Sequence, residues 1–324
     1  MAVTIAPGDV IIDNELVRLG IVETLEQNIN GFNAASNGTI TLGSKRLEND
    51  FTEESFIKGM AALDLVKRRD YTSTADVTPQ KLIEDAVNTV KLSRIYGPMA
   101  TTYDAWNRSG RSVETASLAF GKQLGVAIQA DMLNTLLIAG TAAIDKTNGT
   151  VGDGTQVFDY TNIVDGLVTF GDQMGNIQML VMHSNTYGSM IDKGLSMNAL
   201  DTVGGATIRE GGAYSLGLPV LVTDSPSLYD GTGAYKMLGL TTGALNAIES
   251  DETIMKTQDV LLKENIQKII QGEGSYNVGI KGCKFDDSKS NPEDTDLGNK
   301  DNWTYMFSDV KASAGFQILV KARG

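Results

Sequence analysis

The feature that most constrains the fold is a long helical pattern between residues 111 and 139. One side of this helix carries an apolar stripe at helical spacing, formed by Val113, Ala116, Phe120, Leu124, Ala127 and Ile128. Its second half is apolar on the opposite side as well, at Val126, Leu133 and Leu137. Because an apolar side of a helix has to be buried, we predict that other elements cover this helix from two directions, as they would cover a central strut.

A single carboxylate, Asp131, lies near the middle of the apolar stripe. Burying a carboxylate is costly unless a partner accompanies it. The sequence therefore predicts an ion pair between Asp131 and an arginine on a neighbouring element.

The segment after residue 44 has the opposite character. Residues 39–44 alternate as a strand does, but residues 45–76 are charged and have no sustained apolar face. A segment of this length cannot bury itself inside a compact domain, so we expect it to be mobile or packed on another subunit. Its basic cluster, Lys67, Arg68 and Arg69, has acidic neighbours, which favours an inter-subunit contact over nucleic-acid binding.

Shorter elements precede and follow these two segments. Residues 10–25 are typical of a short helix with Asp13 as its N-cap, which the NINGFNAASNG sequence then ends. Thr78 and Pro79 supply the start of another helix, whose apolar side would hold Leu82, Ile83, Ala86, Val87 and Val90. Beyond residue 160 we predict helices at 162–174 and 185–193, strands at 177–183, 218–223, 235–242 and 260–270, and further strands within 272–285 and 303–322. This alternation predicts a compact α/β subdomain.

The composition limits the partners of the chain. Its 27 Lys and Arg residues stand against 40 Asp and Glu residues, giving a formal net charge of −13. This balance argues against nucleic-acid binding through neutralised phosphates, although it suits a container wall that repels dense DNA. The N-terminus lacks a secretory signal, and no run approaches the ~18 apolar residues that span a membrane. We therefore expect no membrane partner.

Two reactive residue types occur only once each. Cys283 excludes an intrachain disulfide, and its strand-like surroundings indicate a small packed side chain. His183 would need Ser184 or Ser189 for a hydrolytic triad, but no nucleophile elbow or oxyanion loop accompanies it. We predict instead that its ring makes a local hydrogen bond where a strand meets a helix.

The acidic loop at residues 286–302 could offer oxygen ligands to a cation. Its candidates are Asp286, Asp287, Ser288, Ser290, Glu293, Asp294 and Asp296. The glycine and terminal glutamate of a calcium loop are not at their required spacings, so a solvated turn is the default. The sequence thus predicts no catalytic residue, no cofactor and no metal site.

The order of these segments and their local sequences resemble the major capsid proteins of tailed bacteriophages with the Hong Kong 97-type fold. The resemblance covers residues 39–322, through VKLSRIYGPMATTYDAW (90–106), TFGDQMGNIQMLVMHSNTYGSM (169–190), LGLPVLVTDSPSL (216–228), YKMLGLTTGAL (235–245), QGEGSYNVGIKGCKFD (271–286) and NPEDTDLGNKDNWTYMFSDVKASAGFQILVK (291–321).

The resemblance implies an α+β capsid fold. Its parts would be an N-terminal arm (1–38), an extended loop (39–78), a peripheral domain (79–160 and 266–324) with its spine helix (111–140), and an axial α/β domain (161–265). The extended loop would lie over a neighbouring subunit, which explains why it cannot bury itself. Inter-subunit contacts are expected at Lys45, Phe51, Phe56, Lys67, Arg68 and Arg69.

The implied function is that of a structural virion protein, not an enzyme. It would assemble as hexamers and pentamers in the host bacterial cytoplasm, and would enclose double-stranded DNA without binding it specifically. Some relatives begin with a long scaffolding segment, for which residues 1–38 are too short, so a separate scaffolding protein is implied. A portal protein and a decoration protein are further implied partners. Some relatives also cross-link a loop lysine to a neighbour, but Lys45 and Lys58 have no partner that the sequence identifies.

Two other functions remain open at this point. An encapsulin-like nanocompartment shell would share the fold but would need a groove for a cargo peptide. A cytosolic α/β hydrolase would use His183 and a nearby serine, and would lose turnover on His183→Ala.

Overall fold

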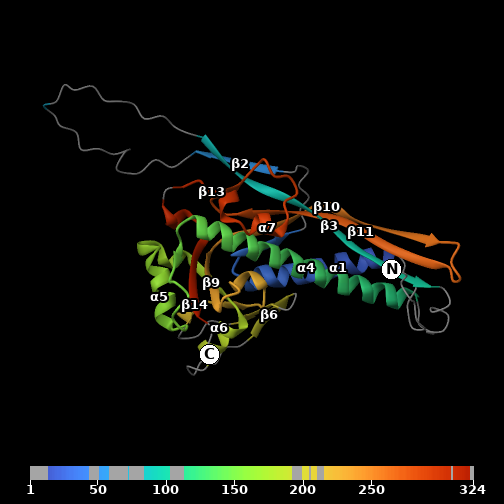
Figure 1. Ribbon diagram of the computed structural model, residues 1–324, viewed down its shortest axis with the longest axis horizontal. Coiled ribbons are helices and arrows are strands. Elements are labelled where there is room, and N and C mark those ends of the chain that lie inside the picture. Colours follow the sequence, from blue (N-terminus) through green and yellow to red (C-terminus); the bar gives the residue numbers. More distant parts are fainter. Residues whose placement is uncertain are drawn as a thin grey trace.

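The computed structural model describes residues 14–43, 51–57, 72, 84–102, 113–191, 199–203, 206–209, 215–307 and 309–321. One long helix, α4 (Val113–Lys146), contacts both of the larger sheets and shares a buried core with them. Two strands, β10 (Leu245–Val260) and β11 (Gln267–Ile280), form a long hairpin that reaches away from the body, with β3 (Glu84–Thr102) running beside it (Figure 1).

Helix α4 is the central strut that its pattern predicts, with Leu133 and Leu137 buried on the second side, but the prediction that Val126 is covered is wrong, because this residue is 41% exposed. Helix α1 (Asn14–Ala35) packs along it, and sheet residues such as Leu245 and Val278 contribute to the same core. The segment Ser117–Lys146 is long and apolar enough to cross a membrane, a property that the residue-by-residue reading of the sequence missed. However, 72% of its most apolar window is buried inside the fold, which makes α4 a core helix.

Helix α1 is longer than predicted, because it continues to Ala35 through the NINGF sequence that was expected to end it. Ile29 and Phe32 are buried and extend the apolar stripe of Val17, Ile21 and Leu25, so packing on α4 outweighs the weak helix propensity of Asn and Gly. The two helices approach closely at Gly121, where an added Cβ would lie 2.3 Å from the Val17 carbonyl oxygen.

The five-stranded sheet has the order β1-β10-β11-β3-β2, where β1 is Ile40–Gly43 and β2 is Phe51–Ile57. β1 runs parallel to β10, and the other neighbours are antiparallel. The helix predicted after Pro79 is wrong from residue 84 onward, because this stretch is strand β3. Asn88, Val90 and Leu92 are buried at alternate positions, and their period of two fits a strand that pairs with both β11 and β2.

The strand predicted at 260–270 is also wrong in its centre. Residues 261–266 form the turn between β10 and β11, and all six are exposed. Leu261, Leu262 and Ile266 resemble strand residues in composition, but they lie at the free end of the hairpin instead of inside a sheet.

The seven-stranded sheet has the order β4-β14-β9-β5-β8-β7-β6. Its strands are β4 (Thr150–Val151), β5 (Ile177–Met182), β6 (Ala199–Val203), β7 (Ala206–Arg209), β8 (Val220–Val222), β9 (Ala234–Thr241) and β14 (Gly315–Lys321). Its strand β5 is buried on both faces: Met179 and Val181 join the core around α4, whereas Leu180 and Met182 pack with residues of α5 (Tyr160–Val168). The predicted strands at 177–183, 218–223 and 235–242 are confirmed. The helix predicted at 162–174 ends at Val168 and continues as the 3-10 helix η1 (Gly171–Asn176), and the helix predicted at 185–193 corresponds to α6 (Ser184–Ile191).

Sheet membership crosses the domain boundaries that the sequence suggests. β14 follows residue 266 but belongs to the seven-stranded sheet, next to β9. β10 precedes residue 265 but belongs almost wholly to the five-stranded sheet, through β1 and β11. The C-terminal strand and the hairpin strand therefore lie in different sheets.

The acidic loop is an ordered unit. It contains α7 (Asp294–Leu297) and the 3-10 helix η4 (Lys300–Asn302), and it connects the paired strands β12 (Cys283–Phe285) and β13 (Trp303–Tyr305). Two more 3-10 helices, η3 (Pro226–Leu228) and η5 (Val310–Ala312), complete the described elements. Leu297 and Trp303 are buried, and the Trp303 indole N–H donates to the Leu297 carbonyl at 2.8 Å.

Candidate assembly surfaces

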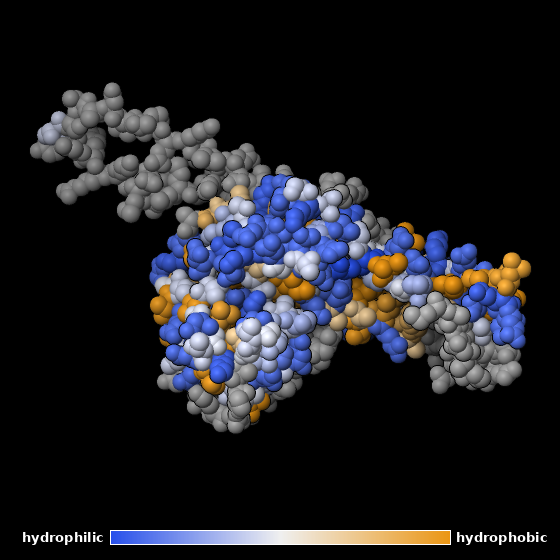
Figure 2. Space-filling model, viewed as in Figure 1, coloured by the Kyte–Doolittle hydropathy of each residue, from blue (hydrophilic) through white to orange (hydrophobic). Residues whose placement is uncertain are grey.

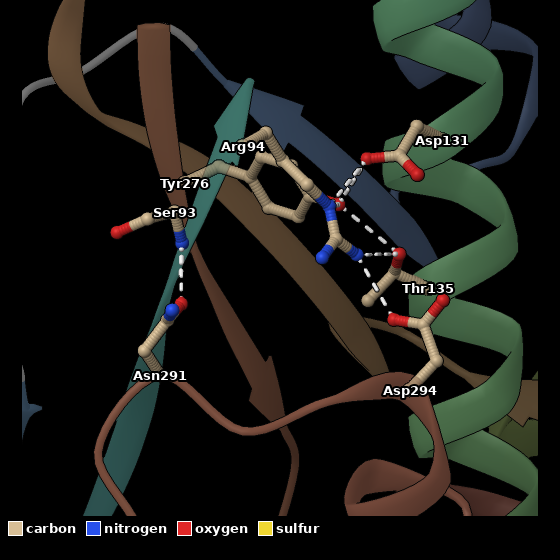
Figure 3. Close-up of polar contacts among 7 residues, drawn as sticks. All are labelled: Ser93, Arg94, Asp131, Thr135, Tyr276, Asn291 and Asp294. Atoms are coloured by element: carbon tan, nitrogen blue, oxygen red, sulfur yellow. Dashed lines mark hydrogen bonds and ion pairs between the residues drawn. The ribbon is translucent and has the colours of Figure 1, made fainter.

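The densest polar contacts join β3, β11, α4 and α7 around Arg94 (Figure 3). We call Arg94, Asp131, Thr135, Tyr276 and Asp294 the Arg94 cluster. The Arg94 Nε lies 2.9 Å from Asp131 Oδ2, and its Nη2 lies 3.0 Å from Asp294 Oδ1 and 3.1 Å from Thr135 Oγ1. The Tyr276 hydroxyl donates to Asp131 Oδ2 at 2.7 Å. The ion pair predicted for Asp131 is confirmed.

The electrostatics of this cluster favour a structural role. Burial and the charge of Asp131 raise the pKa of Tyr276 above its ordinary value, so its hydroxyl stays protonated and keeps donating. Burial also raises the pKa of the neighbouring Tyr96 to about 12. A guanidinium shared by two carboxylates ties four elements together, but it offers neither a nucleophile nor a general base.

Most carboxylates of the acidic loop are held in ion pairs, among them that of Asp294 with Arg94. Its ion pairs join Lys284 to Asp287 (2.7 Å), Lys289 to Asp296 (2.5 Å), Lys300 to Asp145 (3.0 Å) and Lys146 to Asp301 (3.4 Å). The last two connect the loop to the C-terminal end of α4. Within the described ranges, no three His, Cys, Asp or Glu side chains come together as a metal site. The loop is largely exposed, as expected of a solvated turn, and its ion pairs fasten it to α4.

His183 lies between β5 and α6, as predicted. Its Nδ1 accepts a hydrogen bond from the backbone N–H of Asn185 at 3.2 Å, and its ring contacts that of Tyr235 at a tilt of 48°, with the ring centres 4.7 Å apart. The Ser184 hydroxyl lies 3.4 Å from this same Nδ1, while the hydroxyl of Ser189 donates to the Asn185 carbonyl. Because a backbone N–H already occupies the Nδ1 lone pair, this nitrogen is not free to take a proton from serine. The predicted local hydrogen bond is confirmed.

Cys283 is the packed side chain that the sequence predicts. It is buried in β12, and its thiol points to the Ala143 carbonyl of α4 at 3.9 Å. Burial raises the pKa of this thiol to about 12, which keeps it protonated and unreactive at neutral pH.

Five exposed large apolar side chains lie on the β10–β11 hairpin and the neighbouring strand β3. The free end of the β10–β11 hairpin carries Leu261, Leu262 and Ile266, and hydrophobic surface is visible there in Figure 2. Ile95 of β3 and Ile254 of β10 are 61% and 54% exposed, on the outer face of the five-stranded sheet. Contiguous exposed apolar side chains mark interaction surfaces. Sequence reasoning missed all five residues, because Leu261, Leu262 and Ile266 fall inside the strand predicted at 260–270 and the other two gave no local signal.

The contact residues predicted from the sequence are only partly described. Lys45, Lys67, Arg68 and Arg69 lie outside the described residues. Phe51 and Phe56 lie in β2, where the backbone of Phe51 is opposite Val90 and that of Phe56 is opposite Asp85. β2 is thus an edge strand beside β3.

Comparisons of the sequence and of the fold with known proteins both find capsid proteins. The sequence profile of the Gp13-like family, described as "Major capsid protein 13-like", matches residues 9–317. No curated protein matches the chain in sequence. Among solved structures, the "Cyanophage Pam1 capsid asymmetric unit" is similar at a TM-score of 0.50 and 8% identity, over 88% of this chain and 89% of that one. A chain of Mycobacterium phage Patience matches over 100% and 94% at 11% identity and a TM-score of 0.46.

At such low sequence identity, the similarity to solved structures bears on the fold alone. The family profile matches residues 9–317, which is nearly the whole sequence. Together they confirm the α+β capsid fold of the Hong Kong 97 type. The chain belongs to the Gp13-like family of major capsid proteins, the structural proteins that form the heads of tailed bacteriophages.

Proposed function

We propose that this capsid protein assembles as hexamers and pentamers into an icosahedral head that encloses double-stranded DNA. The observation that carries the proposal is the combination of an extensive buried apolar core with uncovered apolar side chains on the hairpin and on the outer sheet face. A chain that functioned alone would gain nothing from leaving Leu262 fully exposed, whereas a shell subunit buries such residues against identical copies.

We assign the domains of a capsid subunit to this chain according to its two larger sheets. We assign the seven-stranded sheet, β14 included, to the axial domain, around which the rings form. We assign residues 1–38, with α1, to the N-terminal arm, the five-stranded sheet with α4 to the peripheral domain, and the segment between β1 and β3 to the extended loop over a neighbouring copy. Phe51 and Phe56 of β2 belong to this loop, together with Lys45, Lys67, Arg68 and Arg69.

The net charge of −13 supports a wall that does not bind DNA specifically. A separate scaffolding protein would guide closure, a portal protein would occupy one vertex, and a decoration protein would bind outside. Assembly would take place in the host cytoplasm. The Arg94 cluster, the buried Cys283 and the backbone-bound His183 support a structural role without turnover.

Negative-stain electron microscopy of the purified chain, expressed with and without a scaffolding protein, tests this function. We expect closed shells of uniform size in the presence of the scaffolding protein, and irregular or fewer shells without it. Discrete monomers or small oligomers under both conditions would overturn the proposal.

A further inference from the structure

The free end of the β10–β11 hairpin exposes two leucines to solvent, and one of them has a backbone conformation that leucine rarely adopts. We call residues 261–266 the hairpin tip. Leu262 is 103% exposed and has a φ of +64°, in the left-handed region that glycine and asparagine adopt more readily than leucine. Leu261 beside it is also exposed. Glycine or asparagine would suit the isolated turn better, so the leucine side chains point to a use outside the isolated chain.

A groove that could receive such a tip lies on the outer face of the same sheet. Ile254 of β10, Glu273 of β11 and Ile95 of β3 are direct cross-strand neighbours, so their side chains form one row on one face. The hollow beside this row has a volume of about 640 Å³ and is also lined by Ser93 and Ser275. This volume lies in the range of protein sites that enclose several apolar groups.

The opposite face of these strands is closed. Met255 and Ile270 are buried in the core with α1 and α4. The apolar groove on the outer face is therefore not a defect of core packing, because the core is complete on the other side.

The groove and the tip of one chain cannot meet. Ile254 and Val260 are both in the extended strand β10, and six residues at a rise of ~3.3 Å separate them by roughly 20 Å. The hairpin is paired along its whole length between them, which prevents it from folding back. A hairpin tip that enters this groove must therefore belong to another molecule.

Charge complementarity favours a second copy of this chain as that molecule. The tip carries Lys263 and Glu264, and the groove carries Glu273 with Lys256 next to Ile254 along the same face. None of these four side chains makes an ion pair within the described part of the chain. A tip entering the groove can place Lys263 beside Glu273 and Glu264 beside Lys256.

We propose that the hairpin tip of one copy inserts Leu261 and Leu262 into the Ile95–Ile254–Glu273 groove of the next copy. This inference rests on the proposed shell function and adds a specific contact to it. The two surfaces are different patches of the same chain, so the contact is head-to-tail and repeats around an axis until a ring closes.

A disulfide trap tests this contact directly. In the variant Leu262→Cys/Ile254→Cys, the two cysteines of one chain are too far apart to bond, since disulfides need Cα atoms within ~7 Å. Native Cys283 is buried. In assembled shells under mild oxidation, we expect the monomer band on a non-reducing gel to be replaced by a ladder of covalent oligomers that reductant reverses. The matched control is Leu262→Cys/Val168→Cys, because Val168 is equally apolar and 61% exposed but lies on α5; it should remain monomeric on the gel.

The outcomes separate this contact from the proposed function. Shells that form without the specific ladder, or with the same ladder in the control, would overturn the contact and leave the shell function standing. A failure of the unmodified chain to form shells would overturn both.

A charge exchange gives an independent check that does not depend on cysteine. Lys263→Glu and Glu273→Lys should each reduce the yield of shells, and the double variant should restore it. A double variant that assembles no better than either single variant would contradict the contact.

Discussion

The two faces of the five-stranded sheet differ along the same three strands. On the inner face, Arg94 of β3 and Tyr276 of β11 are hydrogen-bonded to Asp131 of α4. On the outer face, the next residue of β3, Ile95, is exposed and lies in one row with Glu273 and Ile254. Because side chains alternate along a strand, folding and assembly can be encoded by adjacent residues of one strand. Inner-face variants should then change stability, and outer-face variants should change association.

The largest effect should come from the segment beyond β3. Deleting residues 45–70 removes the extended loop with edge strand β2 but leaves β3, β11 and α4 in place. We expect a cooperative thermal unfolding transition, showing that the body around α4 still folds, together with a complete loss of closed shells in electron micrographs. Normal shells from this deletion variant would show that the loop does not bridge subunits.

The outer face can be tested without disturbing the core. The double variant Ile95→Ser/Ile254→Ser should strongly reduce shell formation, while its free energy of unfolding should change by less than about 1 kcal/mol, as is usual for exposed positions. Sedimentation velocity measures assembly, and urea unfolding measures stability. The control Val126→Ser changes an exposed apolar residue of α4 instead. A large loss of stability in the double variant would mean that this face belongs to the fold.

The inner face should respond in the opposite way. Arg94→Ala removes the cation shared by Asp131 and Asp294, and we expect a loss of about 2 kcal/mol in the free energy of unfolding. The expected loss is smaller than for a fully buried ion pair, because the carboxylates of Asp131 and Asp294 are 41% and 50% exposed. Urea unfolding of the unassembled chain measures it, with Lys122→Ala on the exposed side of α4 as the control. Equal midpoints for both variants would show that the Arg94 cluster contributes little.

The smallest effect concerns alkaline pH. Burial raises the pKa of Tyr96 to about 12 in the folded chain, against ~10 when unfolded. Between these values the unfolded state loses the proton first, so the contribution of Tyr96 to stability is present below pH 10 and declines as the pH rises toward 12. Tyr96→Phe should therefore lose less stability than the unmodified chain between pH 10 and pH 12. Parallel slopes of unfolding free energy against pH would contradict this assignment.

The sequence predicts those parts of the fold in which local pattern and tertiary environment agree. The two-sided stripe of α4 and the apolar run of β5 each occur within one short window, and Asp131 stands out against its neighbours. The pattern at 82–90 is ambiguous, because its apolar residues fit both a helical and an alternating period, and the described part, residues 84–90, is a strand paired with β2. Helix α1 likewise continues past residue 28 because α4 buries Ile29 and Phe32.

The candidate surfaces were harder to predict than the core. Ile95, Ile254 and Glu273 are far apart in sequence and become neighbours only through the register of three strands. The hairpin tip was hidden because Leu261, Leu262 and Ile266 have the composition of a strand. Whether an apolar residue is exposed depends on the folded chain. The sequence alone therefore does not distinguish an apolar residue that binds another molecule from one that is buried in the core.

The central claim is that copies of this chain close into a shell through contacts that the isolated chain leaves open. A cryo-electron microscopy reconstruction of particles assembled from the chain tests it most directly. We predict a closed icosahedral particle built from hexameric and pentameric rings, in which the outer sheet face of each copy is covered by another copy. Open filaments or discrete small oligomers, with the outer face still exposed to solvent, would contradict the account.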